Sequence, residues 1–176
     1  MRMVLAFAGR IGSGKTTLTT ALAKVLGYSR ASFGDYVRHV VQTRGMDQTR
    51  ENLQRIGTDL LEGDRLAFCN EVLRHSGWTA GDGLVIDGLR HAETIELIQR
   101  LTHPLKLKII YLQIDDSLRL ERLAARGDAE ALWLAESHSS EQQVASILAQ
   151  RADLTIDGGD SVHESVQRLV EWVQNQ

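Results

Sequence analysis

One segment constrains the fold of this chain more than any other, the glycine-rich sequence that begins at Gly9 and ends at Thr16. It matches the pattern G-x-x-x-x-G-K-[ST] in full and follows an apolar run at residues 3–8. That run has the length and composition of a buried strand, and an amphipathic stretch at residues 14–26 predicts a helix directly after the glycines. A strand, a tight turn and a helix in this order form the building unit of a parallel α/β sheet.

The same alternation continues to the end of the chain. Short apolar runs predict further strands at residues 83–87, 107–112 and 152–156, and we also expect a short strand at residues 29–32. Helical patterns lie between and after them, at residues 36–43, 49–62, 65–75, 93–101, 117–126 and 161–173. We therefore expect fold class α/β, a three-layer sandwich with a parallel five-stranded sheet and helices on both faces. Residues 127–140 are the least periodic segment and are expected to form a loop or lid.

Composition excludes several classes of protein. The chain has 176 residues, 43% hydrophobic and 24% charged, which suits a single globular domain and excludes a disordered or fibrous chain. A lone cysteine, Cys69, excludes an internal disulfide scaffold. No stretch approaches the roughly 18 apolar residues of a membrane helix, so we expect no membrane association and a cytoplasmic location. The net charge of −3 argues against a stable nucleic-acid partner.

The glycine-rich segment has the chemistry of a phosphate-binding loop. Its backbone N–H groups can converge on one point, and the N-terminus of the following helix adds a partial positive charge. Such a nest binds the phosphates of a nucleoside triphosphate, here ATP. Lys15 can reach the β- and γ-phosphates, and the Thr16 hydroxyl can bind Mg²⁺. The ATP-binding residues predicted in this loop are Gly12, Ser13, Gly14, Lys15, Thr16 and Thr17.

A second ligand for Mg²⁺ is expected at the end of a neighbouring buried strand. Asp87 follows the apolar run Leu84-Val-Ile and precedes Gly88, which leaves room for a substrate. The alternative is an inert Asp-Gly turn. With the phosphate loop present, we favour the metal site, formed by Thr16 and Asp87.

The arginines favour a small kinase among the phosphate-loop proteins. The guanine-binding pattern Asn-Lys-x-Asp of GTPases is absent from the sequence. A kinase needs cations around the transferring phosphoryl group, and the candidates are Arg38, Arg90, Arg122 and Arg126. Arg122 and Arg126 lie four residues apart and can share one helix face. Taken alone, that pair is better explained as a solvated basic stripe paired with Glu121 or Asp116.

Three segments resemble the nucleoside monophosphate kinases, the adenylate-kinase-like group of P-loop kinases. They are the stretch from Ser32 to Arg38, the stretch Asp87-Gly-Leu-Arg90 and the helix from Leu120 to Arg126. The resemblance implies the P-loop nucleotide-kinase fold with a short lid. Stretches at residues 50–59, 138–141 and 152–159 look more like bacteriophage-type deoxynucleoside monophosphate kinases, near dephospho-coenzyme A kinase.

The resemblance also implies roles for individual residues. It implies that about residues 33–80 form an acceptor-binding part and about residues 117–140 a lid-like segment. The loop of Asp157, Gly158 and Gly159 is implied to lie against adenine. The implied catalytic residues are Lys15, Asp35, Arg90, Arg122 and Arg126. The implied acceptor-binding residues are Asp35, Arg38, Gln54, Asp59, Asp87 and Arg90, of which Gln54 and Asp59 are equally acceptable as helix-surface residues.

Two hypotheses follow. The first is a kinase that uses ATP and Mg²⁺ to phosphorylate a small phosphorylated acceptor, a nucleoside or deoxynucleoside monophosphate, with dephospho-coenzyme A as the main rival. The second is an ATP-binding switch or assembly factor that transfers nothing. The sequence leaves open the base and sugar of the acceptor, the oligomeric state, and the roles of His138 and Glu141.

Overall fold

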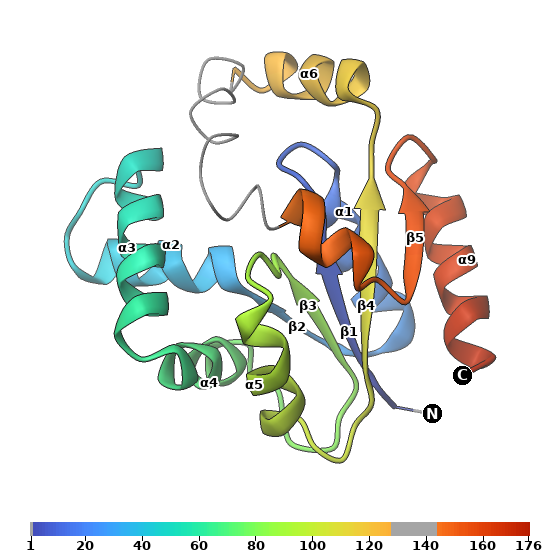
Figure 1. Cartoon of the computed structure of the whole chain (residues 1–176), viewed down its shortest axis with the longest axis horizontal. Helices are drawn as coiled ribbons and strands as arrows, with labels where there is room; N and C mark the ends of the chain where they lie inside the picture. Colours follow the sequence, from blue (N-terminus) through green and yellow to red (C-terminus); the bar gives the residue numbers. More distant parts are fainter. Residues whose placement is uncertain (1, 128–143) are drawn as a thin grey trace.

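Five parallel strands form the centre of the molecule, in the spatial order β2-β3-β1-β4-β5 (Figure 1). The computed structural model describes residues 2–127 and 144–176. The strands are β1 Val4–Ala8, β2 Ser29–Ser32, β3 Leu84–Asp87, β4 Leu107–Gln113 and β5 Leu154–Asp157. The described helices are α1 Lys15–Leu26, α2 Phe33–Thr43, α3 Arg50–Gly63, α4 Arg65–His75, α5 Glu93–Leu101, α6 Asp116–Ala125, the π-helical turn η1 Val144–Leu148, and α9 Val162–Gln174.

Side chains of the central strand alternate between two hydrophobic layers. Leu5 packs in one core with Leu22 of α1 and Leu169 of α9. Ala6 faces the opposite core, to which α5 contributes Ile98. Because both faces of the sheet are covered, the central strand β1 is apolar throughout rather than alternately polar. The predicted three-layer α/β sandwich with a five-stranded parallel sheet is confirmed (Figure 1).

Local hydrogen bonds explain where the element ends differ from the sequence prediction. Helix α2 begins at Phe33 rather than at residue 36, because the Ser32 side chain caps it by accepting a 3.2 Å hydrogen bond from the backbone N–H of Asp35. Strand β5 begins at Leu154 rather than at residue 152. The carboxylate of Asp153 accepts the 2.8 Å hydrogen bond from the backbone N–H of Ile109, in place of a strand carbonyl. The sequence did not predict η1.

The closing helix α9 agrees with its sequence signature. Ser161 accepts a hydrogen bond from the backbone N–H of Glu164, and the Glu164 side chain accepts one from the backbone N–H of Ser161. These reciprocal bonds form the predicted capping box. Within the described residues, no helix is both long and apolar enough to cross a membrane.

Parallel pairing brings the carboxyl ends of the strands to one edge of the sheet. The glycine-rich loop follows β1, helix α2 follows β2, and Asp87 and Asp157 end β3 and β5. Helices α2, α3 and α4 form a group beside β2, at the left of Figure 1. The candidate site therefore lies between this helical group and the loops at the carboxyl edge.

Candidate active site

The glycine-rich loop has the backbone conformation of an anion-binding nest. Gly12 and Gly14 have φ angles of 86° and 94°, a region that residues with a side chain rarely adopt. Gly14 caps α1, whose first turn contains Lys15 and Thr16. The N–H groups at this helix start have no partner within the helix, so the loop can bind phosphate through its backbone.

Lys15 lies inside the loop. It is 8% exposed, and its ammonium group donates hydrogen bonds to the carbonyl oxygens of Gly9 and Arg10 and to the hydroxyl of Ser13. The distance to the Arg10 oxygen is 2.9 Å. A positive charge is thus held beside the backbone nest, where an anionic ligand would meet both.

Thr16 and Asp87 meet at the carboxyl edge of the sheet. The Thr16 hydroxyl donates a 2.9 Å hydrogen bond to Oδ2 of Asp87. Asp87 is 4% exposed, and it is aligned with Phe7 in the pairing of β1 and β3. A hydroxyl and a carboxylate are oxygen donors of the kind that Mg²⁺ prefers, and Mg²⁺ sites beside phosphates commonly use only one or two carboxylates. The donor set therefore fits a magnesium ion bound together with nucleotide phosphates.

Arg30, on β2, is a site residue that the sequence analysis missed. Its guanidinium group donates to Oδ2 of Asp35 at 2.9 Å, to Oδ2 of Asp87 and to the Thr19 hydroxyl at 3.1 Å. The signal available in the sequence was a single arginine within a short strand of small residues. Its importance depends on the neighbouring strand, because β2 pairs with β3 and so places Arg30 near Asp87.

Asp35 and Arg38 form a second ion pair on the first turns of α2. The Arg38 guanidinium donates a 2.6 Å hydrogen bond to Oδ1 of Asp35. Burial raises the pKa of Asp35, but hydrogen bonds from Arg38 and Arg30 and their positive charges lower it more, so this pKa lies below its ordinary value. Asp35 is therefore an anion at neutral pH and a weak base.

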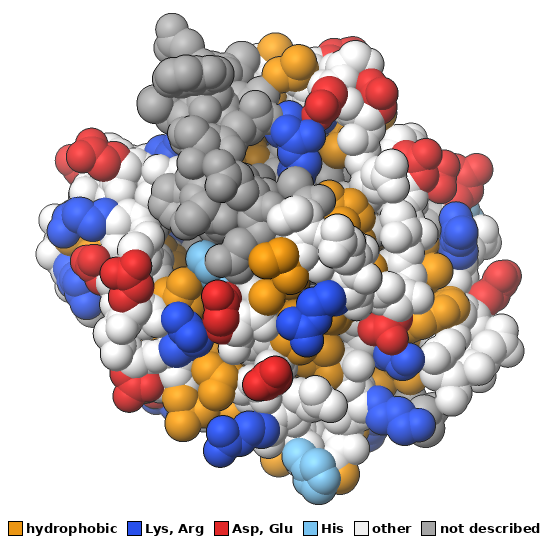
Figure 2. Space-filling model, in the orientation of Figure 1, with side chains coloured by type: hydrophobic (Ala, Val, Ile, Leu, Met, Phe, Trp, Pro, Cys, Tyr) orange, Lys and Arg blue, Asp and Glu red, His pale blue; other side chains and the backbone are white. Residues whose placement is uncertain are grey.

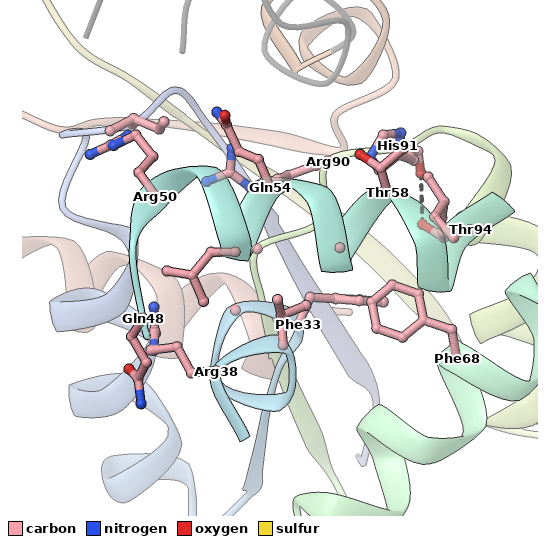
Figure 3. Close-up of a pocket in the computed structure, with 17 residues that line it drawn as sticks. Phe33, Arg38, Gln48, Arg50, Gln54, Thr58, Phe68, Arg90, His91 and Thr94 are labelled. Carbon is pink, nitrogen blue, oxygen red and sulfur yellow. Dashed lines mark hydrogen bonds between the residues drawn. The ribbon is translucent and has the colours of Figure 1, made fainter. Parts of the chain in front are cut away.

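A pocket of about 470 Å³ adjoins this cluster. Its apolar part includes Phe33 and Phe68, whose rings meet edge to face with centroids 5.3 Å apart. Figure 3 shows how the polar side chains are distributed around it. The lining residues are Ile11, Phe33, Gly34, Val37, Arg38, Gln48, Arg50, Leu53, Gln54, Gly57, Thr58, Leu61, Phe68, Gly88, Arg90, His91 and Thr94. Two apolar rings and several cations in one pocket suit a ligand with an aromatic part and an anionic part.

The pocket contains some of the predicted acceptor residues and not others. Arg38, Gln54 and Arg90 line it. Asp35 and Asp87 are not among the lining residues. Asp35 pairs with the lining residue Arg38, and Arg30 joins Asp35 to Asp87. Asp59 is exposed and is not among the lining residues, because the pocket-lining positions of α3 recur every three or four residues and Asp59 is turned away from that face. The structure thus gives the predicted role of Asp59 no support.

The loop after β5 lies against the phosphate loop. A Cβ added to Gly158 would stand 2.9 Å from the backbone oxygen of Ser13 and 3.0 Å from that of Gln113. Arg122 of α6 donates a 2.8 Å hydrogen bond to the backbone oxygen of Gly158. Next to it, Oδ1 of Asp157 accepts a 2.8 Å hydrogen bond from the backbone N–H of Gly159. The predicted adenine loop and one of the predicted lid arginines therefore lie beside the phosphate loop.

Arg126 differs from Arg122. It is exposed where α6 ends, and no described hydrogen bond joins it to the phosphate loop. Arg119, which the sequence analysis did not single out, is buried instead, and a Cβ on Gly12 would stand 3.1 Å from its Cγ. Asp116 pairs with Arg119 at 3.0 Å and with Arg10 of the phosphate loop at 2.6 Å. This acidic residue therefore ties the start of α6 to the loop.

Several predictions fall elsewhere in the molecule. His138, Glu141 and most of the expected lid lie outside the described residues. Cys69 is fully buried in the core, and burial raises the pKa of its thiol to about 11. On the face shown in Figure 2, basic side chains lie among acidic ones rather than in one basic patch.

Comparisons with known proteins agree with this geometry. The AAA domain family matches residues 5–165 of the chain. An adenylate kinase of Parasynechococcus marenigrum is 27% identical over 97% of this chain and 98% of its own length. A cytidylate kinase of Natronomonas pharaonis is 29% identical over 88% of this chain and 74% of its own length. The chain belongs to the AAA domain family and, with these relatives, to its P-loop kinases.

The kinase also resembles a UPF0200 protein. A UPF0200 protein of Aeropyrum pernix is 31% identical over 90% of this chain and 86% of its own length. Among solved structures, a shikimate kinase from Acinetobacter baumannii superposes with a TM-score of 0.63, at 17% identity, over 99% of this chain and 94% of that one. At this sequence identity, the structural likeness shows a shared fold and nothing about the substrate.

Proposed function

We propose that the kinase transfers the terminal phosphoryl group of ATP to a nucleoside or deoxynucleoside monophosphate. The observation that carries the proposal is one chain of contacts across the site. Thr16 of the phosphate loop contacts Asp87, Arg30 joins Asp87 to Asp35, and Asp35 pairs with Arg38 at the rim of the pocket. A donor-phosphate site and an acceptor pocket are thus connected by charged side chains.

The donor side of the proposed reaction uses the loops at the carboxyl edge of the sheet. Residues 12–17 bind the ATP phosphates, with Lys15 as the cation of the loop. Thr16 and Asp87 would hold Mg²⁺, which when bound would supply positive charge against the phosphates. The loop of Asp157, Gly158 and Gly159 packs against adenine, and Arg122, bonded to Gly158, faces the nucleotide.

The acceptor side uses the pocket beside α2 and α3. Arg38 and Arg90 bind the phosphate of the acceptor, because a guanidinium fork matches phosphate oxygens. Phe33 and Phe68 contact the base, whose flat apolar surface suits aromatic neighbours. Gln54 offers both a donor and an acceptor of hydrogen bonds to the edge of the base. About residues 33–80 thus form the acceptor-binding part of the proposed enzyme.

The ion pairs of Asp35 with Arg30 and Arg38 suit a phosphate as the attacking group. An oxygen of the acceptor phosphate forms a bond to the γ-phosphorus, the bond from that phosphorus to the β–γ bridging oxygen breaks, and ADP leaves. An ionised phosphate oxygen has no proton to lose. A hydroxyl would have to lose one. In the proposed reaction Asp35, paired with Arg30 and Arg38, orients Arg38 and the acceptor.

The test is ADP release from ATP and Mg²⁺, scanned over the ribo- and deoxyribonucleoside monophosphates and dephospho-coenzyme A. Mass spectrometry of the products identifies any phosphorylated acceptor. We expect one or a few monophosphates to raise the rate far above the rate with ATP alone. Phosphorylation of dephospho-coenzyme A only would show that the attacking group is a hydroxyl. ATP binding with no acceptor-dependent release would instead favour the ATP-binding switch.

Variants separate the two sides of the site. Lys15→Ala and Arg90→Ala are each expected to lower acceptor-dependent turnover by about 10²–10³-fold, because each removes a cation aimed at transferring or accepting phosphate. Arg100→Ala, at an exposed position on α5, is the control and should keep wild-type turnover. Wild-type turnover in both site variants would contradict the proposal.

A further inference from the structure

We propose that Arg30 is a positioning residue, which holds the acceptor-side carboxylate of Asp35 and the metal-side carboxylate of Asp87 at a fixed separation. The inference rests on the proposed function, because it assigns these carboxylates to the two ends of the phosphoryl transfer. It adds a residue that acts through its neighbours rather than on a substrate.

The geometry uses every nitrogen of the guanidinium group. Nη1 donates to Oδ2 of Asp35 at 2.9 Å, Nη2 donates to Oδ2 of Asp87, and Nε donates to the hydroxyl of Thr19 at 3.1 Å. Thr19 lies on α1, Asp35 on α2 and Asp87 at the end of β3. One side chain therefore joins three elements that carry different parts of the site.

The burial of these groups makes the ion pair important. The Asp87 side chain is 6% exposed and that of Arg30 is 19% exposed. A nearly buried carboxylate is costly unless a cation compensates its charge. Thr16 supplies a hydrogen bond to the same Asp87 oxygen but no charge. Arg30 supplies the compensating charge through its ion pair with Asp87.

Only an arginine can make all three contacts from one position. Its guanidinium group is planar and presents N–H donors in fixed, diverging directions. A lysine keeps the charge but concentrates it at one atom, so it can serve one carboxylate at a time. Glutamine keeps part of the length and some hydrogen bonding but carries no charge. The series Arg30→Lys and Arg30→Gln therefore separates charge from fork geometry.

The first experiment measures the energetic coupling between Arg30 and Asp35 in the absence of any substrate. Urea unfolding is recorded for the wild type, Arg30→Gln, Asp35→Asn and the double variant, which form a double-mutant cycle. We expect the effect of Asp35→Asn on unfolding to be clearly smaller in the Arg30→Gln background than in the wild type. Additive effects would overturn the contact on which the inference rests. If Arg30→Gln does not fold, the same cycle is run with Arg30→Lys.

The second experiment measures the acceptor and ATP separately. We expect Arg30→Gln to raise the KM of the monophosphate acceptor and to lower kcat. The resulting fall in kcat/KM should be about 10–100-fold, the usual size of an effect transmitted through a neighbouring ligand. The KM of ATP should stay within about twofold, because Thr16 also holds Asp87 on the ATP side. Arg30→Lys should recover part of the acceptor effect. Arg74→Gln is the matched control, since Arg74 pairs with Glu71 on α4, away from the phosphate loop.

The outcomes distinguish this inference from the proposed function. A wild type that phosphorylates monophosphates, with Arg30→Gln equally active, overturns the role of Arg30 alone. Equal losses toward ATP and acceptor, without recovery by Arg30→Lys, mean a structural role and also overturn it. A wild type with no monophosphate acceptor overturns the proposed function, and with it the role of Arg30 in holding the acceptor carboxylate.

Discussion

The hydroxyl of Thr16 donates a 2.9 Å hydrogen bond to Oδ2 of Asp87, although 71 positions separate the two residues in the sequence. The contact exists because β1 and β3 are parallel neighbours and both end at the same edge of the sheet. Thr16 follows the glycine-rich turn after β1, and Asp87 is the last residue of β3. An invariant property of parallel pairing thus assembles the two oxygen donors of the proposed magnesium site.

Asp87→Asn tests this pair directly. We expect turnover to fall by about 10²–10³-fold, since the amide lacks the charge that both Arg30 and a magnesium ion need. The Mg²⁺ concentration for half-maximal rate should rise. Steady-state rates at graded Mg²⁺ measure both effects. The control is Asp82→Asn, which breaks an exposed ion pair with Arg2 and should leave both values unchanged. A wild-type Mg²⁺ dependence in Asp87→Asn would remove Asp87 from the metal site.

Gly158→Ala tests the close approach of the β5 loop to the phosphate loop. The added Cβ would stand 2.9 Å and 3.0 Å from two backbone oxygens, so the loops must separate. We expect a loss of about 1–3 kcal/mol in the free energy of unfolding and a raised KM for ATP. Gly63→Ala is the matched control, because its Cβ would meet nothing within 4 Å. Equal stability and equal ATP affinity in both variants would contradict the packing.

Arg122→Ala separates the two arginines predicted for the lid. Arg122 contacts the Gly158 backbone, so its loss should raise the KM of ATP by about tenfold, near the lower end of the roughly 1.5–3 kcal/mol of a hydrogen bond to a charged group. Arg126→Ala should have the smaller effect, because Arg126 is exposed. Nucleotide titration of both variants gives the comparison, with Arg168→Ala on α9 as the control. An effect of Arg126→Ala as large as that of Arg122→Ala would contradict this difference and would favour the joint role predicted from their helical spacing.

Asp35 has a defined pH signature. Its pKa in the folded protein is below the value of about 3.9 expected in the unfolded chain. The ion pairs therefore stabilise the fold above that unfolded value, and this stabilisation is lost as the pH falls through the folded pKa. We expect Asp35→Asn to be less stable than the wild type by at most about 1 kcal/mol at neutral pH, since solvent screens a half-exposed pair.

Urea unfolding of both proteins at several pH values measures this difference. It should be constant from about pH 5 to 8 and shrink only in stronger acid, given an unfolded pKa of about 3.9. A difference that already shrinks near neutral pH would mean that the Asp35 pKa is raised, and Asp35 would then be available as a general base.

Much of the fold could be predicted because it depends on local pattern. Short apolar runs predicted most of the strands, and the capping box of Ser161 and Glu164 predicted the start of α9. The glycine-rich motif predicted a strand–turn–helix unit, because its backbone requirements are those of its own few residues. Helix α2 was predicted too short, since the capping bond from Asp35 to Ser32 outweighs the weak periodicity of the first turn.

The sequence by itself determined the α/β class, the phosphate loop and the candidates Thr16, Asp87 and Arg38, because each is signalled by neighbours within a few positions. Only the tertiary structure decided which candidates meet. Gln54 lines the pocket and Asp59 does not, because the packing of α3 chooses its inner face. Arg30 became part of the site because β2 lies beside β3, a pairing between distant segments that no local pattern specifies.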